Sequence, residues 1–231
     1  MIFGGIQKLT LIDYPGTVAA TVFTVGCNFT CPFCHNPELV DGRLSSSQPK
    51  IDQADILRFF KIRSGILEGV CVTGGEPTLY PDLPDFIREL KNMGFKVKLD
   101  TNGTNPGMVK KMLDENLLDY IAMDIKAPLE KYKKVVGPKI SLESIQQSVE
   151  LTRRAPSYEF RTTVLPALHS RKDILSIGRW LDGSRAYYLQ QFRPIKTLNP
   201  DYSREKSFEW NKLVEICNAL KLFFDVCEIR E

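Results

Sequence analysis

The sequence predicts an α/β fold, namely an open, TIM-like (β/α)6 barrel of parallel strands. Short apolar segments alternate with amphipathic segments of helical period along most of the 231 residues. Polar and glycine-rich residues follow the apolar segments directly, as they do at the loop-bearing edge of parallel α/β folds. No linker divides the chain, so we expect a single domain over residues 1–231, with a lead-in at 1–16 and a C-terminal helix and tail at 204–231.

Each expected strand is a short apolar run that stops at turn-forming or polar residues. The alternation over residues 6–13 ends at a Tyr-Pro-Gly turn, which predicts either a hairpin with the next strand or an irregular lead-in. The six parallel strands are expected at 17–25, 70–73, 95–100, 120–125, 158–165 and 186–192. They end, in the same order, at a Gly-Cys loop, at Gly-Gly, at Thr-Asn-Gly, near Lys126, at Pro166 and at Arg193.

Each expected helix places apolar residues on one side at helical spacing, as Ile56 and Phe60 do in the first. Gly94 closes the second helix, and Asp173 stands in the first turn of the fifth, where an acid is favourable. The helices are expected at 52–61, 82–93, 106–116, 141–153, 170–181 and 204–224, and a polar stretch at 41–49 extends the loop after the first strand.

Composition excludes several classes of protein. A net charge of +3 with interleaved acids and bases gives no basis for a nucleic-acid partner. We find neither a signal peptide nor an apolar run of membrane-spanning length, so we expect no membrane association and a cytoplasmic location. In such a reducing compartment, grouped cysteines favour metal binding or catalysis over disulfides.

Cys27, Cys31 and Cys34 form such a group, in a C-x3-C-x2-C spacing directly after the first strand. One loop can turn three thiolates toward a [4Fe–4S] cluster, leaving one iron for a ligand that is not cysteine, with Phe33 as a shield against water. Two other interpretations stay open, namely three buried thiols and a Cys3His zinc site that includes His35. The remaining cysteines have no paired spacing and are expected in the core.

Gly74, Gly75 and Glu76 follow the second strand. The two glycines predict a close backbone approach with N–H groups free to bind a ligand. Glu76 then either receives a cationic group or acts as a first-turn acid of the following helix.

These elements together resemble the radical S-adenosylmethionine superfamily. The resemblance rests on the cysteine loop with an aromatic residue before its last cysteine, on Gly-Gly-Glu-Pro at 74–77, on Asp-Thr-Asn-Gly at 100–103 and on Asp-Ile-Lys at 124–126. It implies a [4Fe–4S] cluster whose open iron binds S-adenosylmethionine, and reductive cleavage of that cofactor to a 5′-deoxyadenosyl radical.

The same resemblance implies further contacts to the cofactor. Asp100, Thr101, Asn102 and Asp124 would line it, with room for a monovalent cation near its carboxylate, and Lys126 would meet that carboxylate. A buried arginine needs a partner, so Arg161 is either a cofactor contact or half of an internal ion pair. Arg193 stands where related activases carry a polar residue, usually histidine, and this departure leaves its role open.

The lead-in at 5–16, the segment Cys-Pro-Phe-Cys-His-Asn-Pro and Gln-Gln-Phe-Arg at 190–193 resemble the longer branch of activating proteins for the anaerobic ribonucleoside-triphosphate reductase. The implied reaction places a glycyl radical on that reductase, with flavodoxin or ferredoxin as electron donor. Three alternatives remain: a pyruvate formate-lyase activating enzyme, a small-molecule radical enzyme such as a 7-carboxy-7-deazaguanine synthase, and a metal protein without enzymatic activity.

Overall fold

The computed structural model describes residues 1–41, 46 and 49–230, so most of the expected polar stretch at 41–49 lies outside the described residues. Its strands form one nine-stranded sheet in the order β3-β1-β2-β4-β5-β6-β7-β8-β9. The strands are β1 (Ile2–Thr10), β2 (Ala19–Thr24), β3 (Ile51–Asp52), β4 (Gly69–Gly74), β5 (Lys96–Thr101), β6 (Tyr120–Asp124), β7 (Tyr158–Val164), β8 (Ser184–Gln191) and β9 (Phe224–Arg230). Every pair from β2 to β9 in this order is parallel.

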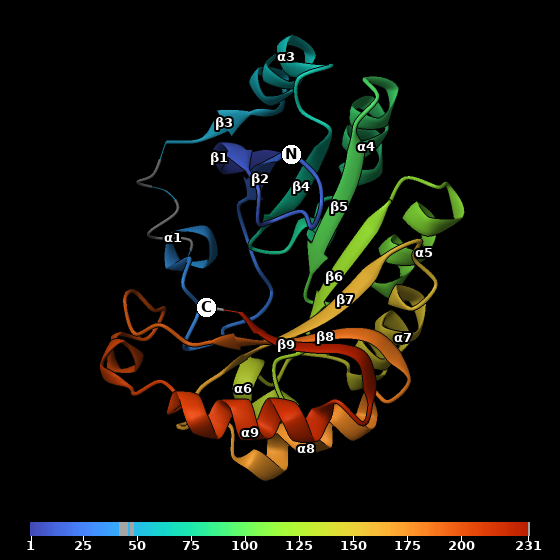
Figure 1. The fold of residues 1–231 in the computed structure, drawn as a ribbon. Coiled ribbons are helices and arrows are strands. Elements are labelled where there is room, and N and C mark those ends of the chain that lie inside the picture. Colours follow the sequence, from blue (N-terminus) through green and yellow to red (C-terminus); the bar gives the residue numbers. More distant parts are fainter. Residues whose placement is uncertain (42–45, 47–48, 231) are drawn as a thin grey trace.

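Helices connect the parallel strands and cover the outer face of the curved sheet (Figure 1). The α-helices of the described residues are α1 (Pro37–Val40), which follows the cysteine loop, and α3 (Gln53–Arg63), α4 (Leu83–Asn92), α5 (Pro106–Asp114), α6 (Tyr132–Val136), α7 (Leu142–Thr152), α8 (Arg171–Trp180) and α9 (Trp210–Leu220). Within the described residues the edge strands β3 and β9 do not pair with each other, so the sheet is open. The expected open (β/α)6 arrangement is therefore confirmed.

The N-terminal lead-in is the hairpin, one of the two forms expected for it. β1 pairs antiparallel with β2, with Phe3 opposite Thr24 and Thr10 opposite Ala19, and two register shifts interrupt the ladder. β1 also pairs with the short β3 on its other side. The lead-in strand β1 and the short β3 thus extend the parallel sheet beyond β2 through antiparallel pairs.

The expected last helix at 204–224 is wrong at both ends. α9 begins at Trp210, and the chain re-enters the sheet as β9, which pairs parallel with β8 from Phe224 opposite Ser184. The run from Leu220 to Phe224 contains no glycine or proline, so no residue type there indicates the end of a helix. The turn is made instead by Lys221-Leu222-Phe223, and the parallel sheet gains a strand beyond the six that were expected.

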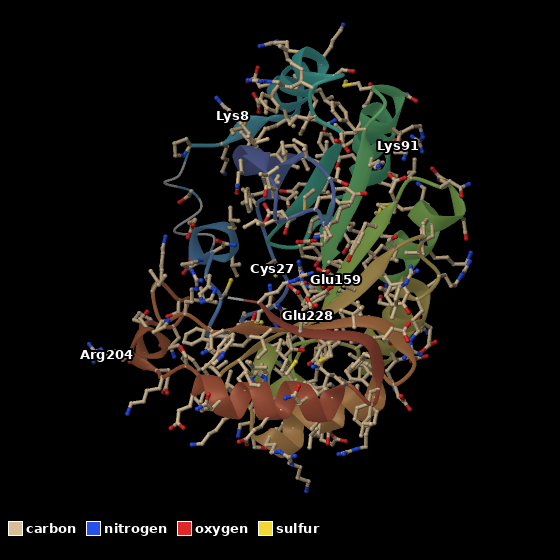
Figure 2. All side chains as sticks on the ribbon, in the orientation of Figure 1. Lys8, Cys27, Lys91, Glu159, Arg204 and Glu228 are labelled. Atoms are coloured by element: carbon tan, nitrogen blue, oxygen red, sulfur yellow. The ribbon has the colours of Figure 1, made fainter. Side chains whose placement is uncertain are left out.

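Two apolar clusters pack between helices and sheet, one centred on Phe60, Leu90 and Leu99 and the other on Phe160, Tyr187 and Leu213. The concave side of the sheet is different, because buried Lys98 and Glu159 lie there among other charged groups. Figure 2 shows Cys27 and Glu159 near the middle of the molecule, whereas Lys8 and Arg204 lie at its surface. None of the described helices is long and apolar enough to cross a lipid bilayer.

Candidate active site

The cysteine loop leaves β2 and is fixed by backbone hydrogen bonds at its start and between its first two cysteines. Gly26 N–H donates to the Leu39 carbonyl at 2.7 Å, and Thr30 N–H donates to the Val136 carbonyl at 3.0 Å. Cys31 and Phe33 are buried, and Cys27 and Cys34 are partly exposed toward a cavity. The aromatic residue before the last cysteine therefore does pack beside the thiols, as expected for a shield.

The three thiols share one electrostatic environment. Burial raises the pKa of Cys27 to about 11 and that of Cys31 to about 12, and it also raises the pKa of Cys34. Lys126 acts in the opposite direction on all three. Because metal ions bind thiolates, a metal centre here would replace protons, and the nearby ammonium favours that exchange.

The Gly-Gly turn after β4 is packed directly under the cysteine loop. A Cβ on Gly75 would lie 2.0 Å from the Gly26 carbonyl oxygen, and Gly74 has a φ of +127°, which favours glycine. The expected close approach is therefore present, but it is made to the chain's own backbone. The expectation of a free N–H is wrong for Gly75, which donates to Thr24 O at 2.9 Å, and the following N–H, that of Glu76, donates to Gly26 O at 2.8 Å.

This packing predicts that Gly75→Ala displaces the cysteine loop. We expect a loss of about 1–3 kcal/mol in unfolding free energy, as for an overpacked core, and less iron after anaerobic reconstitution. Gly107→Ala is the matched control, because its Cβ would meet nothing nearer than 3.7 Å and it lies in α5, where alanine is favourable. Denaturant unfolding and iron content measure both effects, and equal values for the two variants would contradict the close approach.

Glu76 is only 1% exposed and joins the ends of β4 and β5. Its Oε1 accepts from Thr78 N–H (3.0 Å), Thr78 Oγ1 (2.6 Å) and Thr101 Oγ1 (2.8 Å), and its Oε2 accepts from Asn102 N–H (2.6 Å). Burial raises the pKa of Glu76, and these donors act against that rise. Both oxygens thus hold protein groups in place, and a contact to the ammonium of a cofactor stays a prediction.

Arg161 lies between the carboxylates that end β5 and β6. Its Nη1 is 3.1 Å from Asp100 Oδ2, and its Nε is 2.9 Å from Asp124 Oδ1. Lys98 also pairs with Asp100, and Lys126 Nζ lies 3.0 Å from Asp124 Oδ2. Arg161 therefore forms the internal ion pair that was one of its two expected roles.

These pairs decide the charge state of the two carboxylates. Burial would raise the pKa of Asp124, but Arg161 and Lys126 outweigh burial and hold it well below its ordinary value. Arg161 and Lys98 likewise lower the pKa of Asp100. Both carboxylates therefore stay ionised with cations of the chain beside them, and a further monovalent cation at this position stays a prediction.

A cavity of about 330 Å³ opens at the carboxyl ends of the parallel strands. All the predicted site residues except Arg193 line it: Cys27, Cys31, Phe33, Cys34, Gly74, Gly75, Glu76, Asp100, Thr101, Asn102, Asp124, Lys126 and Arg161. Arg193 lines a neighbouring cavity of about 420 Å³, and the two cavities share His35, Thr163 and Gln190.

His35 is turned away from the thiols. Its ring stacks on Phe192 at 5.4 Å, and Nε2 donates to the Arg193 carbonyl oxygen at 2.9 Å. Within the described residues, no three His, Cys, Asp or Glu side chains converge as ligands of a single metal ion. This arrangement argues against a Cys3His zinc site, whereas a cubane is larger and offers a separate iron to each sulfur.

The sequence model of the radical SAM superfamily matches residues 21–176, which contain the cysteine loop and the ends of β4, β5 and β6. The chain belongs to the radical SAM superfamily. Membership implies a [4Fe–4S] cluster and S-adenosylmethionine. The three thiols fit such a cluster, because Lys126 offsets their charge and aromatic side chains pack against them.

Two relatives extend this comparison over almost the whole chain. A protein of Methanocaldococcus jannaschii, named "putative glycyl-radical enzyme activating enzyme", is 31% identical over 237 residues, covering 99% of this chain and 95% of that protein. The pyruvate formate-lyase-activating enzyme of Clostridium pasteurianum is 28% identical and covers 84% of this chain and 81% of its own length. The crystal structure of Streptococcus suis SuiB bound to the precursor peptide SuiA has a TM-score of 0.66 at 12% identity, covers 91% of this chain and 48% of that chain, and shows a shared fold.

Four charged residues at or near the site were not predicted from the sequence. Lys98 could have been found, because it faces the same side of β5 as Asp100 two residues later. Glu159 and Arg230 could not, since their bidentate pair, with distances of 2.9 Å, joins β7 to the unexpected β9. Asp13 lines the cavity from the lead-in and accepts from Thr21 Oγ1 at 2.6 Å, and no spacing in the sequence pointed to it.

Proposed function

We propose that this chain is a radical S-adenosylmethionine activase that generates a glycyl radical on the anaerobic ribonucleoside-triphosphate reductase. The observation that carries the proposal is the single cavity in which the three cysteines meet the polar ends of β4, β5, β6 and β7. The two activating enzymes that match most of this chain support the class of reaction. The open sheet supports a protein substrate, because its edge strands leave the concave side without a closing strand.

Each residue then has a defined task. Cys27, Cys31 and Cys34 would hold the cluster, and the buried ring of Phe33 would keep water from it. When bound and reduced, the cluster would supply one electron to cleave S-adenosylmethionine into methionine and a 5′-deoxyadenosyl radical, which takes a hydrogen atom from the glycine. Lys126 lies close enough to act on the thiols and would also meet the carboxylate of the cofactor.

The charged network behind these residues orients them. Arg161 fixes Asp100 and Asp124, so their oxygens are held at the cavity wall instead of rotating freely. Thr101 and Asn102 present polar groups at the same edge, and Arg193 reaches the adjoining cavity, where it would contact the adenosine part or the partner protein. A reduced flavodoxin or ferredoxin would supply the electron.

The reductase is the preferred partner because the lead-in hairpin and residues 190–193 resemble its activators. The test mixes reduced protein, S-adenosylmethionine and purified reductase under anaerobic conditions. We expect a glycyl radical signal by electron paramagnetic resonance, and no signal when S-adenosylmethionine is omitted. A signal with pyruvate formate-lyase, and none with the reductase, would reassign the partner.

A small-molecule substrate is the second candidate, and a different relative favours it. A protein of Sulfolobus acidocaldarius named a probable GTP 3′,8-cyclase is 44% identical over 210 residues, covering 90% of this chain and 64% of that protein. Consumption of GTP or of another small molecule, with 5′-deoxyadenosine formed in step and no protein partner present, would replace the activase proposal.

A further inference from the structure

The side-chain amide of Asn102 has a fixed orientation. Its Oδ1 accepts from the Thr104 backbone N–H at 3.0 Å and from Thr104 Oγ1 at 2.7 Å. A backbone N–H can only donate, so the atom that faces it must be the amide oxygen. The NH₂ group therefore points the other way, toward Asn28 Oδ1 at 2.9 Å and Cys27 Sγ at 3.8 Å.

Burial and two further hydrogen bonds hold this amide in place. Asn102 is 5% exposed, and its own backbone N–H donates to Glu76 Oε2 at 2.6 Å. Asn28 Nδ2 donates to Thr104 Oγ1 at 2.8 Å, which closes a ring of hydrogen bonds through Asn28, Thr104 and Asn102. Rotation of the Asn102 amide would therefore break bonds on both of its sides.

Cys27 receives a second donor from its own loop. The backbone N–H of Phe29 lies 3.4 Å from Cys27 Sγ. Two N–H groups, one from the cysteine loop and one from the end of β5, thus approach the same sulfur. The loop donor follows from the local turn, whereas the Asn102 donor reaches across from a different strand.

We propose that Asn102 donates an N–H···S hydrogen bond to the Cys27 thiolate and thereby stabilises the reduced form of the cluster. This inference rests on the proposed function, because it needs Cys27 as a cluster ligand. Reduction adds negative charge that the ligand sulfurs share, so a donor at a sulfur favours the reduced state and raises the reduction potential. Glu76 and Asn28 are positioning residues here, because they act through the Asn102 amide.

The test compares reduction potentials of the reconstituted holoprotein by redox titration followed by electron paramagnetic resonance. In Asn102→Ser the shorter side chain no longer reaches the sulfur. We expect the ratio of reduced to oxidised cluster at a fixed potential to fall about tenfold, which corresponds to 59 mV for a one-electron couple. Asn102→Asp keeps an oxygen for Thr104 but loses the donor, so its potential should fall at least as far.

Asn105→Ser is the matched control. The side chain of Asn105 caps α5 by accepting from Met108 N–H at 3.1 Å and donates to Thr78 O at 2.8 Å, without contact to a thiol. Serine also caps helices, so this variant should keep the wild-type potential. An unchanged potential in both Asn102 variants would overturn the proposal, as would an equal fall in Asn105→Ser.

Two measurements on the wild-type protein complete the test. If the Asn102 variants lose their iron, the test uses wild-type protein labelled with ¹⁵N-asparagine. Electron–nuclear double resonance of the reduced cluster should then show a ¹⁵N coupling, and its absence would contradict the hydrogen bond. Iron, sulfide and 5′-deoxyadenosine measured on wild-type protein test the proposed function separately. Suppose that the wild-type protein binds a cluster and cleaves the cofactor, but the Asn102 variants keep the wild-type reduction potential. That result would remove this inference and leave the proposed activase function in place.

Discussion

Replacing Cys31 with alanine is expected to abolish cleavage of S-adenosylmethionine. Cys31 is the most buried of the three loop cysteines, and Lys126 lies beside it. A cluster held by two cysteines loses a third of its protein ligands, so iron and sulfide content after reconstitution should fall sharply. The measurement is 5′-deoxyadenosine formed under dithionite, which should drop to the level without protein, and Cys27→Ala and Cys34→Ala should behave alike.

Cys217→Ala is the control for that experiment. Cys217 is buried on α9, its sulfur lies 3.7 Å from that of Cys227, and neither residue lines the cavity. The expectation that both are core residues is confirmed. This variant should keep its iron and its cleavage activity. Cleavage retained in Cys31→Ala, or iron lost in Cys217→Ala, would contradict the assignment of the cluster ligands.

Replacing Arg161 with methionine is expected to destabilise the protein by about 3–5 kcal/mol, the range found when one partner of a buried ion pair is removed. The Arg161 side chain is 11% exposed, and its loss leaves Asp100 and Asp124 with lysines as their remaining cationic partners among the described residues. Denaturant unfolding near neutral pH measures the difference. A change below about 1 kcal/mol would mean that the network carries little of the stability.

The pH dependence of the same variant gives a second readout. The pKa values of Asp100 and Asp124 are lowered in the folded protein, so the unfolded state binds more protons in acid. Their contribution is present above an unfolded pKa of about 3.9 and is lost as the pH falls below it. Without Arg161 the folded pKa values rise, and this acid-dependent loss of stability should become smaller.

Arg58→Met provides the surface comparison. Arg58 pairs with Asp55 at 2.9 Å on one side of α3, with side chains 71% and 55% exposed. Water screens such a pair, so the variant should lose no more than about 1 kcal/mol. A loss as large as that of Arg161→Met would show that burial is not what makes the Arg161 network costly to break.

The cysteine loop and the strand ends were predictable because their signals are local. Three cysteines in a fixed spacing need no distant residue to be recognised, and parallel strands bring their carboxyl ends to one edge of a sheet. Cys27, Gly75, Asp100 and Asp124 therefore fell into one cavity as expected. The turn before β9 carries no such signal, so β9 was not predicted. Arg230 on β9, which pairs with Glu159, was therefore not predicted as a residue near the site.

Sequence alone thus determined the superfamily, the parallel α/β architecture and the residues that line the cavity. Tertiary structure decided what those residues contact. Arg161 became an ion-pair centre, Gly75 N–H bonded to the last residue of β2 and Glu76 N–H to Gly26 in the cysteine loop, and Asn102 turned its amide toward Cys27. The physical reason is that a buried polar group must find its partner in space, and here each partner comes from another strand or loop tens of residues away in the chain.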